Sequence, residues 1–399
     1  VHGWVMSSAL WGTVVGSLIG GWPTERLGRR QTLFWVGILY FVSAVWSGLA
    51  TGAYTLIIAR FIGGVGVGIS TIAAPLYIAE ISPAHARGRL AGMFQFNIVF
   101  GILVAFLSNA LLSGIGEHAW RWMLGIEALP ALVYTLCCVG LIESPRWLIV
   151  HRRDREAGFA VLRTINPGTS DAALAAVAEE IEASVGQHVR AEAFFTRRLF
   201  TPIMLAFLIA FFNQLSGINA ILYFAPRIFE MTGLAKSAAL LQSVGVGVTN
   251  LIFTFAGLWL IDKAGRRTLL EIGSYGYIAS LGACAWAFYT GHEAIVPLCI
   301  FAFIAAHAIG QGAVIWVFIS EIFPNRNRAA GQALGSFTHW IFAALLTLFF
   351  PMMAERFHPG TLFALFCGMM VLQLIWVKTV VPETKGIPLE QMQKKMGIM

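Results

Sequence analysis

Glu25-Arg-Leu-Gly-Arg-Arg-Gln-Thr-Leu33 occurs a second time in the chain, as Asp262-Lys-Ala-Gly-Arg-Arg-Thr-Leu-Leu270, 237 residues later. Ala79-Glu-Ile-Ser-Pro83 likewise recurs 241 residues on, as Ser320-Glu-Ile-Phe-Pro324. A third pair, Glu143 and Glu383, is separated by 240 residues. Three matches at nearly one spacing indicate that the chain consists of two homologous halves in parallel orientation.

The composition places both halves in a membrane. Of the 399 residues, 58% are hydrophobic and only 12% are charged, whereas a soluble domain carries about 25% charged residues. Apolar runs of about twenty residues match the length of a helix that crosses a bilayer core. Barrel strands would instead alternate in polarity over roughly ten residues. We therefore expect an all-α membrane protein.

The distribution of Lys and Arg predicts how the helices are oriented. Eleven apolar spans are predicted at 4–23, 31–51, 54–78, 90–112, 121–142, 201–225, 237–261, 268–290, 295–319, 330–353 and 360–381. Of the 27 Lys and Arg, 21 fall in one set of connecting loops and 4 in the other. Because cytoplasmic loops collect basic residues, the C-terminus is predicted to be cytoplasmic. The net charge of +7 is then a signal of topology beside the lipid bilayer, and no nucleic-acid partner is expected.

Comparison of the halves predicts one further helix. The second half has 61 residues between 201 and Asp262, but only 24 precede Glu25 in the first. We therefore expect eleven of twelve helices to be present, arranged as the two six-helix halves of a major facilitator fold. The predicted divisions are an N-terminal half (1–143), a cytoplasmic linker (144–200), a C-terminal half (201–381) and a cytoplasmic tail (382–399). The linker is interpreted as short helices, one over 171–185, or alternatively as disordered.

Several features have simpler structural interpretations. Gly63, Gly64, Gly66 and Gly68 resemble a phosphate-binding loop but lie inside an apolar span, where close helix packing is the better interpretation. The five cysteines all lie in apolar stretches and are expected to be buried. The sequence contains no Cys or His spacing typical of a metal site and no catalytic triad. We predict neither an enzyme nor a bound cofactor.

Together the motifs resemble those of the sugar porter family of the major facilitator superfamily. The pattern includes the two acidic Gly-Arg-Arg turns, Pro75-Leu-Tyr-Ile-Ala-Glu80, Glu143-Ser-Pro-Arg-Trp-Leu148, Gln214-Leu-Ser-Gly-Ile-Asn219 and Pro382-Glu-Thr-Lys-Gly386. The resemblance implies transport of a monosaccharide by alternating access in the plasma membrane, in a bacterium the inner membrane. It favours proton symport. A sugar uniporter, a cyclitol or polyol transporter and a non-transporting sugar receptor are the alternatives.

A cluster of amides marks the predicted substrate site. Asn213, Gln214 and Asn219 lie within an apolar span, where an unpaired amide costs several kcal/mol. Such amides serve either a binding site or hydrogen bonds between helices, and sugar hydroxyls suit amide partners. The resemblance favours a sugar site; Asn213 stands where relatives carry Gln. The resemblance also implies the following substrate-binding residues: Gln95, Tyr223, Asn250, Trp316, His339 and Trp340.

Two further groups of charged residues are assigned functions. Arg60 lies about six residues inside a span, and Glu127 lies at similar depth in another. An ionisable residue inside the membrane is a functional hypothesis by default, so the pair is predicted either to couple transport to the proton or to form a structural ion pair. The predicted cytoplasmic gate, expected to latch the halves together through ion pairs, contains Glu25, Arg26, Arg29, Arg30, Glu80, Arg87, Glu143, Arg146, Asp262, Arg266, Arg267, Glu321 and Glu383.

Overall fold

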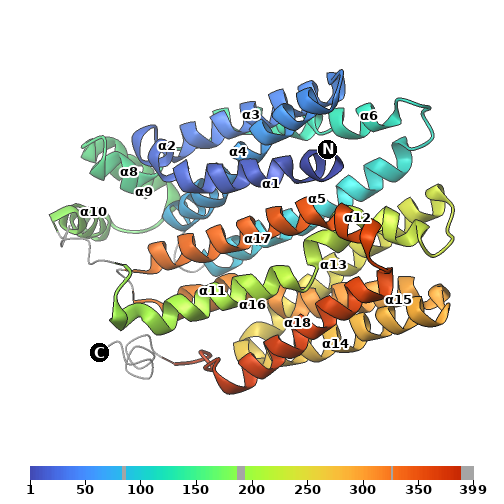
Figure 1. The fold of residues 1–399 in the computed structure, drawn as a ribbon. Helices are drawn as coiled ribbons and strands as arrows, with labels where there is room; N and C mark the ends of the chain where they lie inside the picture. The colour runs from blue at the N-terminus through green and yellow to red at the C-terminus, as the bar shows by residue number, and fades with distance from the viewer. Residues whose placement is uncertain (83–86, 187–193, 325–326, 388–399) are drawn as a thin grey trace. The chain divides into compact units, whose positions relative to one another are not determined.

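The computed structural model describes residues 1–82, 87–186, 194–324 and 327–387. Within these ranges the chain is helical, and no β-strand occurs. Figure 1 shows long helices joined by short connections. The expectation of an all-α protein is therefore confirmed, with the tail beyond residue 387 lying outside the described residues.

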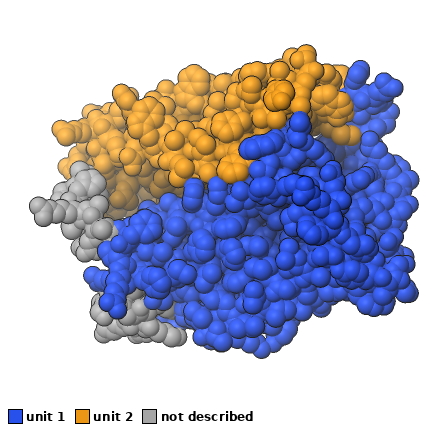
Figure 2. Space-filling view, viewed as in Figure 1, with its two compact units in different colours: residues 1–7, 96–119, 194–399 blue, residues 8–95, 120–193 orange. Residues whose placement is uncertain are grey.

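The chain divides into two compact units, which Figure 2 distinguishes by colour. Unit 1 contains residues 1–7, 96–119 and 194–399, and unit 2 contains residues 8–95 and 120–193. Residues 1–7 and 96–119 thus group with the C-terminal part of the chain rather than with their sequence neighbours. The predicted halves at 1–143 and 201–381 rest on the sequence repeat and stay a prediction.

The first part of the chain, through residue 194, contributes ten helices among the residues that the structure describes. They are α1 (His2–Ile19), α2 (Gly21–Arg26), α3 (Arg29–Leu49), α4 (Ala53–Ile81), α5 (Arg87–Leu112), α6 (Ala119–Gly125), α7 (Ala128–Val139), α8 (Pro145–Val150), α9 (Arg155–Ile165) and α10 (Asp171–Gly186). Helix α3 packs on α4 and α7 within unit 2. The predicted linker helix over 171–185 is confirmed as α10.

The remaining helices belong to unit 1. They are α11 (Phe200–Leu215), α12 (Ile218–Glu230), α13 (Lys236–Ala264), α14 (Arg266–Thr290), α15 (Val296–Ile309), α16 (Gln311–Ile322), α17 (Arg328–Arg356) and α18 (Pro359–Thr379). Short 3-10 turns at Arg197–Leu199 and Glu293–Ile295 precede α11 and α15. Helix α17 lies alongside α11, and α14 packs against both α15 and α18 (Figure 1).

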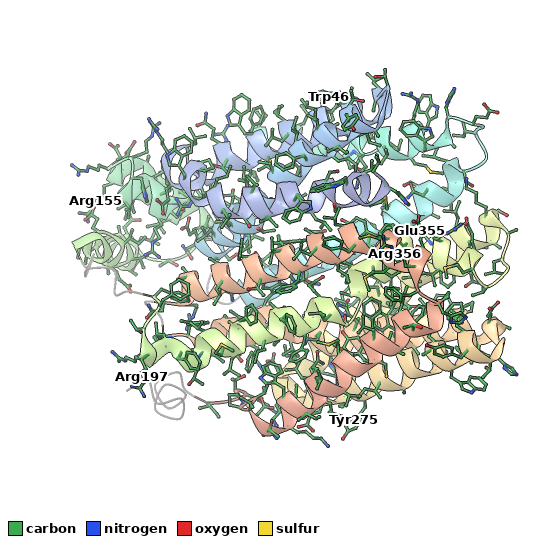
Figure 3. All side chains as sticks on the ribbon, viewed as in Figure 1. Trp46, Arg155, Arg197, Tyr275, Glu355 and Arg356 are labelled. Carbon is green, nitrogen blue, oxygen red and sulfur yellow. The ribbon has the colours of Figure 1, made fainter. Side chains whose placement is uncertain are left out.

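Each of the eleven predicted spans coincides with one helix or with two consecutive helices. In the described part of the chain, nine helical segments are long and apolar enough to cross a membrane. The two predicted spans outside these nine, α1 and α14, are also helical but less apolar. Large apolar side chains face outward in both units, among them Trp46 on α3 (Figure 3), as expected where lipid replaces water.

Glycines allow close helix packing inside unit 2. A Cβ at Gly12 would lie 2.1 Å from the carbonyl oxygen of Phe61, and one at Gly64 would lie 1.9 Å from that of Ala9. Helices α1 and α4 therefore approach backbone to backbone, as small residues permit in membranes. The prediction that the glycines near residue 64 serve packing rather than phosphate binding agrees with this geometry.

The short helices after residue 144 form a small cluster of their own. Ile149, Leu162 and Leu174 are buried together between α8, α9 and α10. On the outside, the Arg155 guanidinium lies 3.2 Å from the Glu182 carboxylate, at a position labelled in Figure 3. These helices therefore bury their apolar faces against one another and keep charged side chains on the outside.

Candidate functional site

Two broken helices of unit 1 bring polar groups into an apolar interior. Helix α11 ends at Leu215 and α12 begins at Ile218, with Gly217 between them in the left-handed conformation (φ 85°). Helix α15 ends at Ile309, and α16 begins after Gly310. A Cβ at Gly217 would meet the Phe366 ring at 2.7 Å, so both backbone conformation and space require glycine there. Breaks of this kind expose polar groups in transporters.

The break at Gly217 brings the three predicted amides together. Gln214 Nε2 donates to Asn213 Oδ1 at 2.9 Å, and Asn219 Nδ2 donates to Gln214 Oε1 at 2.7 Å. On an uninterrupted helix, residues five apart would not face each other. The turn at Gly217 redirects α12, so that the Asn219 side chain returns to Gln214. Asn213 and Gln214 are buried, whereas Asn219 stays partly accessible.

Helix α17 adds a histidine and an indole to this cluster. Gln214 Nε2 lies 3.1 Å from His339 Nδ1, close enough for a hydrogen bond. The His339 ring lies between two indoles, with its centroid 5.3 Å from that of Trp316 and 4.9 Å from that of Trp340. The sequence assigned all three rings to the substrate site, and the structure brings them together beside the Gln214 amide.

Sequence analysis missed the second half of this polar network. Gln311 Nε2 donates to Gln373 Oε1 at 2.8 Å, and Gln373 Nε2 donates to Ser274 Oγ at 2.7 Å. Asn213 Nδ2 makes a longer contact of 3.5 Å with Gln311 Oε1. The signal was available, because Gln311 and Gln373 are single amides within apolar spans, where an unpaired amide is costly.

A second set of polar contacts surrounds the Gly-Arg-Arg turn of unit 2. Gly28 has a φ of 95°, and its turn presents the backbone amides of α3 to one carboxylate. Glu143 Oε1 accepts from the N–H groups of Arg29 and Ser144, at 3.0 and 2.8 Å. The Arg29 guanidinium lies 2.9 Å from the Glu80 carboxylate, with both side chains nearly inaccessible.

The corresponding turn of unit 1 repeats these contacts. Gly265 has a φ of 93°, and Glu383 accepts from the N–H of Arg266 at 2.9 Å and from that of Arg267 at 3.1 Å. The Arg266 guanidinium lies 2.7 Å from the Glu321 carboxylate. A carboxylate at the N-terminus of a helix is stabilised by the helix dipole and by the free amides there. The sequence repeat therefore corresponds to one set of contacts, between a turn arginine and two glutamates, that occurs once in each unit.

Comparison with known proteins agrees with this architecture. A family model described as "Sugar (and other) transporter" matches residues 1–396. The chain belongs to this family. It is therefore an integral membrane protein that functions as a transporter and not as an enzyme.

Relatives of this sugar transporter include characterised symporters. It is 34% identical to the D-xylose-proton symporter of Escherichia coli over 98% of this chain and 85% of the relative. It is also 34% identical to the arabinose-proton symporter of Bacillus subtilis, over 99% of this chain and 86% of that protein. The inward-open structure of the E. coli xylose transporter XylE matches this structure with a TM-score of 0.86 and 32% sequence identity. The match covers 98% of this chain and 88% of the XylE chain. The predicted major facilitator fold is thus confirmed.

Three further residues of the transporter were predicted to bind substrate. Asn250 is buried on α13, and within the described residues it makes no hydrogen bond to that cluster. Tyr223 is half-buried on α12, in the same unit. Gln95 is half-buried on α5 and belongs to unit 2. The assignment of these three residues to substrate binding stays a prediction.

Arg60 and Glu127 both belong to unit 2. Glu127 lies in the two-residue break between α6 and α7, which the sequence did not predict. Arg60 acts on Glu127 electrostatically, although within the described residues the two form no ion pair. The Arg60 Nε is buried and has no hydrogen-bond partner in that part of the chain.

The remaining gate residues differ in what they contact. Asp262 lies 3.2 Å from the Arg266 guanidinium, and the Arg267 side chain pairs with Glu271 at 3.1 Å. Arg30 Nη2 donates to the Val139 carbonyl, whereas the Arg26 guanidinium lies over the Trp22 ring. The exposed residues Glu25 and Arg146 form no ion pair within the described chain. The side chain of Arg87 lies outside the described residues.

Proposed function

We propose that this chain carries a monosaccharide across a lipid bilayer together with a proton, by alternating access. The observation that carries the proposal is the cluster of Asn213, Gln214 and Asn219 beside the rings of Trp316 and His339. Amides donate and accept hydrogen bonds as sugar hydroxyls require, and indole faces suit the apolar C–H faces of a sugar ring. The xylose- and arabinose-proton symporters named above support both the substrate class and the proton.

The proposal assigns the coupling function to Arg60 and Glu127. The Arg60 guanidinium acts electrostatically on Glu127, and its Nε has no hydrogen-bond partner within the described ranges. Such a charge inside a span favours a carboxylate whose proton occupancy changes during transport. With Glu127→Gln, we expect sugar accumulation against a gradient to be lost while exchange of sugar at equal concentrations persists. If accumulation survived in this variant, Glu127 would have a structural function only.

Uptake by purified protein in proteoliposomes tests the main proposal. Radiolabelled pentoses and hexoses are supplied with and without an inward proton gradient, and saturable accumulation driven by the gradient is expected. Saturable equilibration that ignores the gradient would instead establish a uniporter. Uptake of a cyclitol or polyol but of no monosaccharide would change the substrate class, and saturable sugar binding without any flux would indicate a receptor.

The proposed topology places the two Gly-Arg-Arg turns and the C-terminus in the cytoplasm, in a bacterium beneath the inner membrane. The bias of Lys and Arg toward these loops supports it. In this arrangement the ion pairs of Arg29 and Arg266 lie at the cytoplasmic ends of the helices. We also propose that these ends latch the two halves together when the cytoplasmic side closes; the ion pairs described above each lie inside one unit. Labelling of single cysteines introduced at the exposed residues Arg146 and Arg227 from either side of sealed vesicles tests the topology.

A further inference from the structure

The buried amides of unit 1 form one continuous chain of side-chain hydrogen bonds, and all the bonds point the same way: each amide NH₂ group donates to the oxygen of the member before it. At its far end, the Ser274 hydroxyl donates to the Leu270 carbonyl at 2.7 Å. From Ser274 on α14, this hydrogen-bond chain runs through side chains of α18, α16 and α11 and ends on α12. Its members in order are Ser274, Gln373, Gln311, Asn213, Gln214 and Asn219.

The Leu270 carbonyl determines which way each amide faces. Because the Ser274 proton is given to that carbonyl, Ser274 Oγ is free only to accept, and Gln373 must present its N–H to it. The Gln373 oxygen then faces Gln311 and accepts from it. The same logic continues through each amide, since each has one oxygen and one NH₂ group and turns both toward the chain.

The last member of the series, Asn219, belongs to the candidate substrate site. Asn219 donates to Gln214 Oε1, so its own Oδ1 remains as a free acceptor; within the described residues this oxygen has no hydrogen-bond partner. Gln214 has no such freedom, because its NH₂ group is shared between Asn213 and His339. Asn219 is also the partly accessible member of the cluster.

We propose that Ser274, Gln373 and Gln311 are positioning residues that hold Asn219 Oδ1 toward the substrate, and so select a sugar hydroxyl that donates a hydrogen bond there. This inference rests on the proposed sugar-binding function. Gln311, Gln373 and Ser274 are fully buried, and at least three successive contacts separate each of them from Asn219. If the chain served stability alone, apolar side chains of the same shape would replace it at little cost.

The contact between Asn213 and Gln311 is the longest in the chain at 3.5 Å. This contact joins α16 to α11, so the direction set at Ser274 reaches the amides on α11 through it. Loss of the Ser274 anchor therefore releases the remaining amides to face either way. Asn219 would then present its NH₂ group to the substrate for part of the time.

Sugar analogues separate the two directions of the Asn219 amide. A fluorine in place of a hydroxyl accepts weakly but cannot donate, and a deoxy position can do neither. Binding of D-xylose, D-glucose and their mono-fluoro and mono-deoxy analogues to the complete purified protein is measured by calorimetry. In the wild type, replacing one particular sugar hydroxyl by fluorine or by hydrogen should weaken binding of the sugar about tenfold, the equivalent of a single hydrogen bond.

Variants at the anchor complete the experiment. With Ser274→Ala, we expect weaker binding of the parent sugar and a fluoro analogue that binds better than the deoxy analogue. Ser274→Thr, which keeps the hydroxyl, should restore the wild-type pattern. The matched control is Ser280→Ala on the same helix, because Ser280 makes the same kind of bond to the Gly276 carbonyl at 2.7 Å but belongs to no amide chain.

Each result bears on the inference. If Ser274→Ala is not stably folded, Gln311→Met interrupts the chain at its middle and should give the same change in the ratio of fluoro to deoxy affinity. An unchanged ratio in the folded variant, or a wild type that tolerates fluorine at every position, would overturn the inference while leaving sugar binding intact. A wild type that binds none of these sugars would contradict the proposed function itself, and the inference with it.

Discussion

Gly217 shows how a single residue creates the geometry of the amide cluster. Its left-handed backbone redirects α12, and this turn lets the Asn219 amide reach Gln214 at 2.7 Å. Sequence analysis placed these amides in one span. It could not predict the pairing, because on a straight helix residues 214 and 219 point in different directions.

Replacement of Gly217 tests this at the residue scale. Gly217→Ala should destabilise the protein by about 1–2 kcal/mol through the positive φ alone, with more from the contact of Cβ with Phe366, and should weaken sugar binding. Gly101→Ala on α5 is the matched control, since a Cβ there meets nothing within 4 Å and alanine favours a helix. Thermal unfolding in detergent and sugar affinity are the measurements; equal melting temperatures for both variants would contradict the argument.

Gln311 and Gln373 mark the limit of prediction at this scale. Each was visible as an amide within an apolar span, and the cost of burying an unpaired amide was reason to single it out. Their pairing joins α16 to α18, segments 62 residues apart in the chain. Such a contact depends on tertiary packing, which a periodic pattern along one helix does not encode.

At the scale of the helix, hydropathy located the spans but not all their interruptions. The break at Gly310 falls in a stretch with two glycines, Gly310 and Gly312. The break before Ala128 has no such signal at its own positions, Ile126 and Glu127. The residues on both sides of a break are apolar because both helices remain in the membrane. The mean hydropathy of the span therefore does not reveal the break.

The close approach of α14 and α15 supplies the second prediction. A Cβ at Gly273 would lie 2.9 Å from the Gly310 Cα atom, whereas one at Gly282 on the same helix meets only the Cys367 sulfur at 3.7 Å. We expect Gly273→Ala to destabilise by about 1–3 kcal/mol through overpacking. Because α16 follows Gly310 and carries Trp316, sugar affinity should also fall.

Gly282→Ala is the control for that prediction. It should be neutral or stabilise the helix by up to about 1 kcal/mol with unchanged sugar affinity. Melting temperature and affinity are measured together for both variants. Should Gly273→Ala melt at the same temperature as Gly282→Ala, the backbone contact at Gly310 would not limit helix packing.

At the scale of the whole molecule, three short matches in the sequence predicted a duplicated architecture, and the structure contains the same contacts twice. Arg29 and Arg266 each pair with a glutamate from the second motif, at 2.9 and 2.7 Å. The sequence also predicted that these charges bind one half to the other. The ion pairs lie within each unit, since a buried guanidinium is best satisfied by the carboxylate nearest to it on adjacent helices.

A double-mutant cycle between the two copies supplies the third prediction. Glu143→Gln and Glu383→Gln each remove charge-assisted hydrogen bonds to backbone amides and should cost about 2 kcal/mol apiece. Their effects should add within about 0.5 kcal/mol in the double variant, because the contacts of each carboxylate lie within its own unit. Stability is followed by thermal unfolding, and uptake is measured in parallel. A coupling well above that value would demonstrate the proposed latch between halves.

The carboxylates that close the two Gly-Arg-Arg turns have a consequence for biosynthesis. Glu143 accepts from the Arg29 amide 114 residues earlier, and Glu383 from the Arg266 amide 117 residues earlier. During translation, the backbone amides at each Gly-Arg-Arg turn therefore remain uncapped until the glutamate that binds them, more than 110 residues later, emerges from the ribosome. The first half can complete its closure while the second is still being synthesised, so the order of the motifs along the chain sets the order in which the halves mature.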